Sequence, residues 1–226
     1  MKYAILGSGI VGRTIAARLV ELGHDAMLGT HDVDALMART APDMMGNPPF
    51  AVWQAQNTGV KVGTFSMAAA HGAALVNATN GSGSLAALYL AGANNLAGKL
   101  LIDVSNPLDF SQGMPPSFFV SNTDSLGEQI QRAFPDAQVV KALNTMTAAL
   151  MVNPKQLAGG EHTVFLSGND ASAKAQTAEL LRSFGWRDIV DLGDITTARG
   201  SEMLVSPWLR LMGALQTPMF NFKIVR

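Results

Sequence analysis

Short apolar segments alternate along the chain with longer stretches in which apolar residues recur every three or four positions. The short segments predict strands at residues 3–6, 26–28, 60–65, 74–78, 100–104, 138–143, 163–167 and 189–192. Such runs are typical of strands buried on both faces of a sheet. The longer stretches predict helices at residues 11–22, 33–39, 68–72, 84–91, 126–134, 171–184 and 198–215. This alternation predicts parallel strands joined by crossover helices.

Six residues between the first predicted strand and the first predicted helix form a glycine-rich turn. In such a turn the first glycine permits a tight bend and the second lets the backbone approach a ligand. The third allows the helix to pack closely on the strand. The free N–H groups at the helix start, with the positive end of its dipole, bind phosphate. The pattern therefore predicts a dinucleotide whose diphosphate is held by Gly7, Ser8, Gly9, Ile10, Val11 and Gly12.

The element order and the glycine turn together predict the fold class. We expect an α/β protein with a doubly wound, mostly parallel Rossmann sheet and a helical extension at its C-terminal end. A length of 226 residues favours one NAD(P)-binding domain over residues 1–226. Residues 1–145 would form its dinucleotide-binding core, and residues 146–226 would add further strands and the final helix.

Composition narrows the classes of function. Apolar residues make up 48% of the chain and charged residues 15%, which excludes a disordered chain. Sixteen basic and seventeen acidic residues give a net charge of −1, which argues against nucleic-acid or anionic-membrane partners. The sequence has no cysteine, which excludes disulfides and thiolate chemistry. Its apolar runs are shorter than the roughly 20 residues of a spanning helix, so we expect a cytoplasmic protein.

The end of the second predicted strand bears on the choice of dinucleotide. NAD-selective sites usually carry an acidic residue there, which binds the ribose 2′-hydroxyl. This chain has Thr30 at that position, with His31 where NADP enzymes often have arginine. Asp32 could serve NAD if the strand were longer, but we interpret it as the N-cap of the following helix. The pattern favours NADP over NAD.

Small uncharged polar residues follow three other predicted strands, at residues 77–81, 105–108 and 144–146. Ligands of doubly wound sheets bind beyond the carboxyl ends of the strands, so these groups suit recognition of ribose and carboxamide. Ordinary turn chemistry is the alternative interpretation of each segment.

Residues typical of acid–base or metal catalysis do not form a recognisable group. The four histidines lack metal-ligand spacing, so we predict neither a metal site nor a catalytic side chain. Lys141, in the strand before the third polar segment, is a conceivable general acid. We interpret it instead as a strand-edge lysine that reaches solvent or pairs with Asp103.

Four segments of the sequence resemble one known family. They are the glycine turn, the strand end at residues 141–145, the strand and turn at residues 165–170, and the closing run that contains Ser201, Glu202 and Pro207. Together they resemble the NADP oxidoreductases dependent on coenzyme F420, over nearly the whole chain. The chain is also similar to the cytoplasmic reductase module of STEAP-type metalloreductases. The resemblance implies hydride transfer between NADPH and a deazaflavin or flavin, with both rings stacked in one cleft.

The resemblance also implies which residues bind the cofactor. The glycine turn would hold the diphosphate, and Thr30 and His31 would lie at the 2′-phosphate. The residues bordering the nicotinamide and the second ring would be Ala78, Thr79, Asn80, Ser105, Asn106, Leu143, Asn144 and Thr145. Family members commonly have Ser-Arg at residues 30–31 and a bulky pair such as Pro-Trp at residues 79–80. The first departure implies weaker binding of NADP than in the family. The second removes an aromatic side chain that could cover the acceptor ring, which leaves the identity of the acceptor open.

Two other functions stay open at this point. The chain could bind NADP(H) as a redox sensor without turnover, or it could reduce an imine or carbonyl, which needs a proton donor near the nicotinamide. The final helix carries more apolar residues than a free terminal helix needs. We therefore expect it to pack on the cofactor cleft or across the interface of a homodimer.

Overall fold

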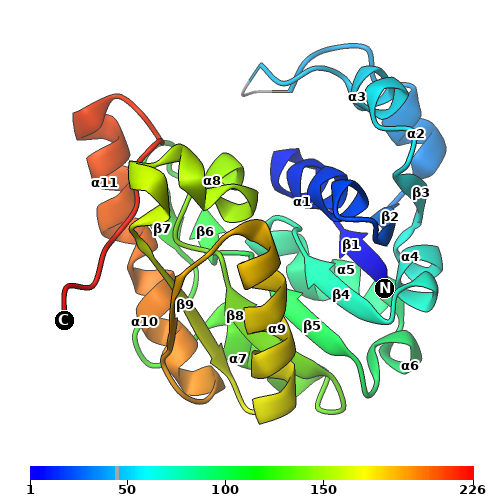
Figure 1. Cartoon of the computed structure of the whole chain (residues 1–226). Coiled ribbons are helices and arrows are strands. Elements are labelled where there is room, and N and C mark those ends of the chain that lie inside the picture. Colours follow the sequence, from blue (N-terminus) through cyan, green and yellow to red (C-terminus); the bar gives the residue numbers. More distant parts are fainter. Residues whose placement is uncertain (44–45) are drawn as a thin grey trace.

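The structure, a computed structural model, describes residues 1–43 and 46–226 (Figure 1). Its centre is an eight-stranded sheet. Six neighbouring strands of this sheet, β8, β5, β4, β1, β2 and β3, are parallel to one another. The strands lie in the order β10 (Asp188–Asp191), β9 (Thr163–Gly168), β8 (Gln138–Ala142), β5 (Leu100–Asp103), β4 (Ala74–Asn77), β1 (Lys2–Leu6), β2 (Asp25–Thr30) and β3 (Lys61–Thr64). The doubly wound, mostly parallel sheet that the sequence predicts is confirmed.

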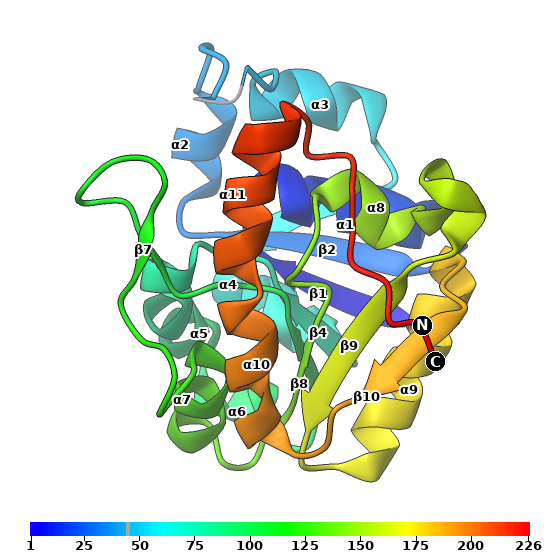
Figure 2. The same cartoon turned by 90° about the vertical axis from the view of Figure 1, so that its left-hand side faces the viewer.

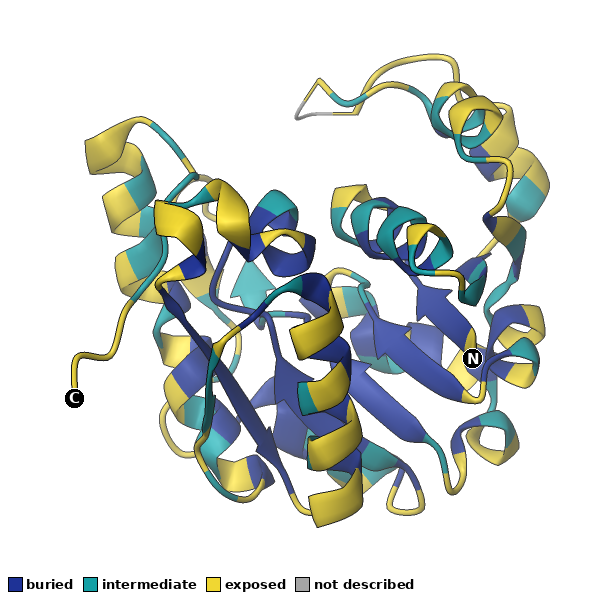
Figure 3. Cartoon of the chain, in the orientation of Figure 1, coloured by how far each residue is buried: buried dark blue, intermediate teal, exposed yellow. Residues whose placement is uncertain are grey.

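Helices cover both faces of the sheet (Figure 1). One face packs against α1 (Ile10–Glu21), α8 (Ala148–Val152) and α9 (Ala171–Phe184), and the buried Phe50 of α3 (Phe50–Gln56) belongs to the same core. The other packs against α4 (Phe65–His71), α5 (Ser84–Ala91), α6 (Ala93–Leu96) and α7 (Leu126–Ala133). Neighbouring residues of a strand point to opposite faces, so Ile5 and Leu6 of β1 enter different cores. Figure 3 shows the strands buried and the outer helix faces exposed.

The helix ends follow local sequence chemistry. Helix α9 spans the predicted residues 171–184 because Asp170 caps its first turn, accepting from the N–H of Ala173 at 2.7 Å. Gly185 ends it at φ 108°, a left-handed conformation that glycine adopts at little cost. Helix α2 (Val33–Met37) begins in the same way at Asp32. Within the described part of the chain, no helix is both long and apolar enough to cross a membrane.

Strand β9 does not continue the parallel pattern that the alternation of elements predicts. It pairs antiparallel with β8, and β10 lies parallel to β9. A parallel β9 would need a crossover that carries the chain back across the sheet. The connection from β8 contains only the five-residue α8 and two 3₁₀ turns, Pro154–Gln156 and Ala158–Gly160, so β9 starts at the edge where β8 ends.

The predicted final helix is two helices, α10 (Ala198–Met203) and α11 (Val205–Leu215), which run nearly end to end (Figure 2). They separate at Leu204 because Pro207 has no N–H to donate to the carbonyl four residues earlier. Helices α3, α6 and α8 are not among the helices that the hydrophobic pattern predicts. Residues 105–121, where the sequence predicts neither a strand nor a helix, contain a small hairpin of β6 (Leu108–Asp109) and β7 (Ser117–Phe118).

Candidate dinucleotide site

The glycine turn joins β1 to α1 in a conformation that only glycine fits at two of its positions. Gly7 has φ 116°, and a Cβ there would lie 2.5 Å from the carbonyl oxygen of Ala78. A Cβ on Gly12 would lie 1.9 Å from the carbonyl oxygen of Gly7. Gly9 differs, because a Cβ there would meet no atom within 4 Å. Neighbouring backbone therefore leaves no space for a side chain at Gly7 and Gly12, whereas the space beside Gly9 is open.

The open side of the turn is the start of α1. Gly9 is the N-cap residue, and no described side chain caps it. The first N–H groups of this twelve-residue helix therefore keep the partial positive charge that binds phosphate. An open space at Gly9 and an uncapped helix start are what the diphosphate of a dinucleotide requires.

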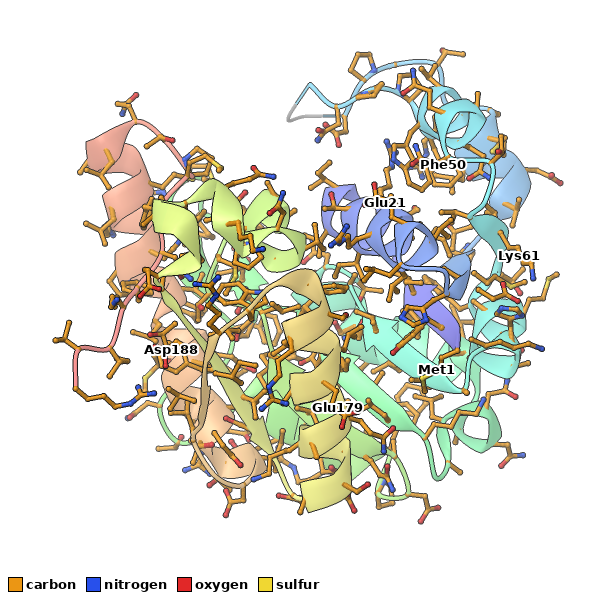
Figure 4. The ribbon with its side chains drawn as sticks, in the orientation of Figure 1. Met1, Glu21, Phe50, Lys61, Glu179 and Asp188 are labelled. Carbon is orange, nitrogen blue, oxygen red and sulfur yellow. The ribbon has the colours of Figure 1, made fainter. Side chains whose placement is uncertain are left out.

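Arg13 connects the glycine turn with the segment before α3. Its side chain is buried, and its Nε donates to the carbonyl oxygen of Ser8 at 2.9 Å. Its Nη1 donates to the carbonyl oxygen of Pro48 at 2.7 Å, and the guanidinium lies 5.1 Å from the ring centre of Phe50. Figure 4 labels Phe50, which lies beside α1. Burial lowers the pKa of Arg13 from its ordinary value. Arg13 is not among the predicted site residues, although its position directly after the third glycine is a usable signal.

The end of β2 contains the residues predicted to meet the 2′-phosphate. His31 is exposed there, whereas Thr30 ends the strand with only 8% of its surface accessible. The carboxylate of Asp32 accepts a hydrogen bond from the N–H of Ala35 at 2.9 Å. Its interpretation as a helix cap is thus confirmed. Of the two residues predicted to meet the 2′-phosphate, His31 offers the larger surface to a ligand.

A row of polar side chains crosses the sheet at the carboxyl ends of its central strands. Asn77 of β4, Asp103 of β5 and Lys141 of β8 occupy matching positions in the ladders. The amide Nδ2 of Asn77 donates to Asp103 at 2.9 Å. Asp103 also accepts from the N–H and hydroxyl of Ser105, at 3.2 and 2.6 Å. The row extends to Thr79, whose hydroxyl donates to Asn77 at 2.6 Å.

Lys141 is the centre of this row and is fully buried. Its Nζ lies 2.8 Å from Asp103, 2.8 Å from Glu202 and 2.6 Å from the carbonyl oxygen of Ser105. These three acceptors use all three N–H bonds of the ammonium group. Burial lowers the pKa of Lys141, but the two carboxylates outweigh that effect, so its pKa lies above the ordinary value. The predicted pairing with Asp103 is confirmed, and the predicted reach to solvent is wrong.

The tips of β5 and β8 are joined by a pair of amides. Asn106 donates to the carbonyl oxygen of Asn144 at 2.8 Å, and Asn144 donates to the side-chain oxygen of Asn106 at 3.0 Å. Before Asn144, Leu143 has φ 62°, a conformation that costs a leucine about 1–3 kcal/mol. Strain of this kind often marks functional segments. Here it follows directly on the strand that carries Lys141.

The structure brings the predicted residues to one edge of the sheet, but it exposes them unequally. The buried ones are Gly7, Gly12, Thr30, Ser105, Leu143, Asn144 and Thr145. The residues with accessible surface at this edge are Ser8, Gly9, Ile10, Val11, His31, Ala78, Thr79, Asn80 and Asn106. The buried members can shape the site, and the accessible ones can touch a ligand.

Glu202 is a second residue that the sequence analysis missed. It belongs to α10, yet its carboxylate accepts from the N–H groups of Leu126 and Gly127 at 2.9 and 3.0 Å, besides its contact with Lys141. Leu126 lies 76 residues away in sequence. Only the family-like run at Ser201-Glu202 pointed to this segment, and no local pattern predicts the contact.

A doubly wound sheet with an open glycine turn at the start of α1 defines a dinucleotide-binding protein of the Rossmann class. Comparison with known proteins identifies the family. A family described as NADP oxidoreductase, coenzyme F420-dependent, matches residues 2–107. A candidate F420-dependent NADP reductase of Arthrobacter sp. FB24 is 58% identical, with full coverage of both chains and a TM-score of 0.97. The chain belongs to this family of NAD(P)-dependent oxidoreductases.

Two further similar proteins show how widely the fold is used. The metalloreductase STEAP3 of Rattus norvegicus is 30% identical over 96% of this chain, which spans 38% of that protein's length. An imine reductase of Streptomyces aurantiacus is 12% identical, with a TM-score of 0.64 over 96% of this chain and 63% of that one. The second likeness shows the fold alone.

Proposed function

We propose that the protein transfers hydride between NADPH and a flavin or deazaflavin such as coenzyme F420. The observation that carries the proposal is the uncapped start of α1 behind an open Gly9, at the same sheet edge as the polar tips of β4, β5 and β8. The names of the family and of the Arthrobacter protein support NADP as one partner and F420 as the other. The nicotinamide supplies the hydride when NADPH is bound.

The residues of this chain would align the two rings and exclude water. The amides at the start of α1 would hold the diphosphate, with Ser8, Gly9 and Ile10 nearest to it. His31 would meet the 2′-phosphate, beside the end of β2. The residues with accessible surface at the strand tips, Ala78, Thr79, Asn80 and Asn106, would border the nicotinamide. The proton that completes reduction of the acceptor would come from solvent.

The position of Lys141 argues against this lysine as the proton donor in the reduction of an imine or carbonyl. A proton donor for that reaction must come within hydrogen-bond reach of the substrate. All three N–H bonds of Lys141 point to acceptors inside the protein, and its side chain is inaccessible. Transfer between two cofactor rings makes no such demand on a side chain, so it fits the geometry better.

The test is a calorimetric titration with NADPH and NADH, followed by a panel of acceptors. The matched control is Gly9→Asp, because a side chain at this open position leaves the fold intact but places a carboxylate against the diphosphate. We expect the wild type to bind NADPH more tightly than NADH, and the variant to bind neither. NADPH absorbance should then fall with F420, FMN or FAD and not with small carbonyls. NADPH binding without consumption by any acceptor would contradict the proposal and favour a sensor.

We also infer that the protein is a homodimer that covers the apolar side of α11. Val205 is the only buried residue of this helix, and Leu211 and Leu215 are 38% and 54% exposed. Sedimentation should give a dimer for the wild type and a monomer for Leu211→Glu. A monomeric wild type whose C-terminal helix is cut readily by protease would contradict this inference.

A further inference from the structure

Helix α10 reaches the strand tips through two consecutive residues. The carbonyl oxygen of Ser201 accepts a hydrogen bond from Asn144 at 3.1 Å, and the carboxylate of Glu202 lies 2.8 Å from the Nζ of Lys141. Both contacts are buried. The C-terminal helix pair is therefore attached to the sheet edge at which the candidate site lies.

Glu202 is held there by charge as well as by hydrogen bonds. Lys141, Asp103 and Glu202 have side chains 0%, 0% and 3% exposed, and together they carry one positive and two negative charges. The carboxylate of Glu202 also accepts hydrogen bonds from the N–H groups of Leu126 and Gly127 at the positive end of α7, which stabilise the surplus negative charge. A buried cluster of this kind keeps its geometry only while every member is present, since a missing partner leaves an uncompensated charge.

Two series of contacts connect helix α10 with groups that have access to the ligand side. Glu202 contacts Lys141, which donates to the carbonyl oxygen of Ser105, and the next residue, Asn106, is partly exposed. The carbonyl oxygen of Ser201 accepts from Asn144, which also donates to the side chain of Asn106. Both routes from α10 thus end on Asn106 at the tip of β5.

We propose that Glu202 is a positioning residue that sets the strand tips against the nicotinamide end of the dinucleotide. The inference rests on the proposed function, because it takes the nicotinamide to lie at the tips of β4, β5 and β8. The adenosine end would lie at the glycine turn and β2, where Glu202 has no contact. Loss of Glu202 should therefore affect the two ends of the cofactor unequally.

The experiment compares Glu202→Gln with Arg199→Gln in the full chain. Arg199 lies on the same helix and also contacts α7, with its Nη2 2.6 Å from Glu128, but it has no contact with the strand tips. Calorimetry would measure the binding of NADPH and of 2′,5′-ADP, which contains only the adenosine end. We expect Glu202→Gln to weaken NADPH about tenfold and 2′,5′-ADP less than twofold. Arg199→Gln should change both less than twofold.

The measured affinities for NADPH and 2′,5′-ADP can overturn the inference. Equal weakening of both ligands by Glu202→Gln, or unchanged NADPH affinity, would overturn it while leaving the proposed function standing. A wild type that binds 2′,5′-ADP no more weakly than NADPH would show that the nicotinamide makes no contact, and both proposals would fail. Should Glu202→Gln not fold, Glu202→Asp keeps the charge with a shorter reach. We then expect NADPH alone to weaken, by a smaller factor, and equal weakening of both ligands would again overturn the inference.

Discussion

The two ends of the candidate site are built in different ways. At the glycine turn, backbone atoms form the site, and Gly7, Gly9 and Gly12 lie within six residues of one another. At the strand tips, side chains from β4, β5, β8 and α10 meet in one buried network. The first end depends on local sequence, and the second depends on groups that the fold brings together from distant parts of the chain.

The two ends tolerate different kinds of substitution. The glycine turn is sensitive to added atoms, because its backbone segments touch. The strand tips are sensitive to lost charges, because buried carboxylates without a cation are costly. Substitutions at the two ends should therefore fail for opposite physical reasons.

The largest effect is expected for Lys141→Met, which leaves Asp103 and Glu202 buried without a cation. We expect a loss of about 3–5 kcal/mol in the free energy of unfolding, measured by urea denaturation. Lys174→Met is the control, because that lysine pairs at the surface with Asp191. It should lose far less, since surface ion pairs contribute little. Similar losses in the two variants would show that the buried network contributes no more to the free energy of unfolding than a surface ion pair.

Gly12→Ala tests the glycine end. The new Cβ would lie 1.9 Å from the carbonyl oxygen of Gly7, and backbone cannot move aside cheaply. We expect a loss of about 1–3 kcal/mol in the free energy of unfolding, together with loss of NADPH binding. Gly9→Ala, which meets no atom within 4 Å, should keep its stability. Equal melting temperatures for the two variants would contradict the close approach at Gly12.

His31→Arg tests the binding of the 2′-phosphate at the adenosine end. The substitution should leave the fold intact, because His31 is exposed. A guanidinium beside the 2′-phosphate should form a charge-assisted pair with it. We expect the affinity for NADPH relative to NADH to rise about tenfold in calorimetric titrations. An unchanged ratio would show that the 2′-phosphate binds elsewhere.

Asp124→Asn provides a reference outside both ends. The hydrogen bond from Arg132 lowers the pKa of Asp124 from 3.8 to about 2. Its stabilising effect is therefore present above pH 3.8 and disappears as the pH falls through about 2. Because Arg132 is exposed, the variant should lose less than about 1 kcal/mol at pH 7. Thermal melts should show the two proteins converging near pH 2, and a constant difference would contradict the assignment.

The sequence predicted the elements that local patterns control. Strands buried on both faces, the glycine turn and the full span of α9 follow from hydrophobic spacing and capping residues. The direction of β9 could not be predicted, because it depends on how the short connection after β8 crosses the sheet edge. Likewise, the burial of Lys141 depends on Glu202 of α10, a partner that spacing along the chain cannot reveal. The single domain, the cytoplasmic location and the individual cofactor contacts stay predictions.

Lys141 has a consequence for chemical labelling of the folded protein. An amine-reactive ester needs an accessible nitrogen with a free electron pair, and Lys141 has neither while its ammonium group holds three acceptors. The more exposed Lys61 and Lys223 would react first. Acylation of Lys141, followed by mass spectrometry of its peptide, would therefore report how often α10 detaches from the sheet.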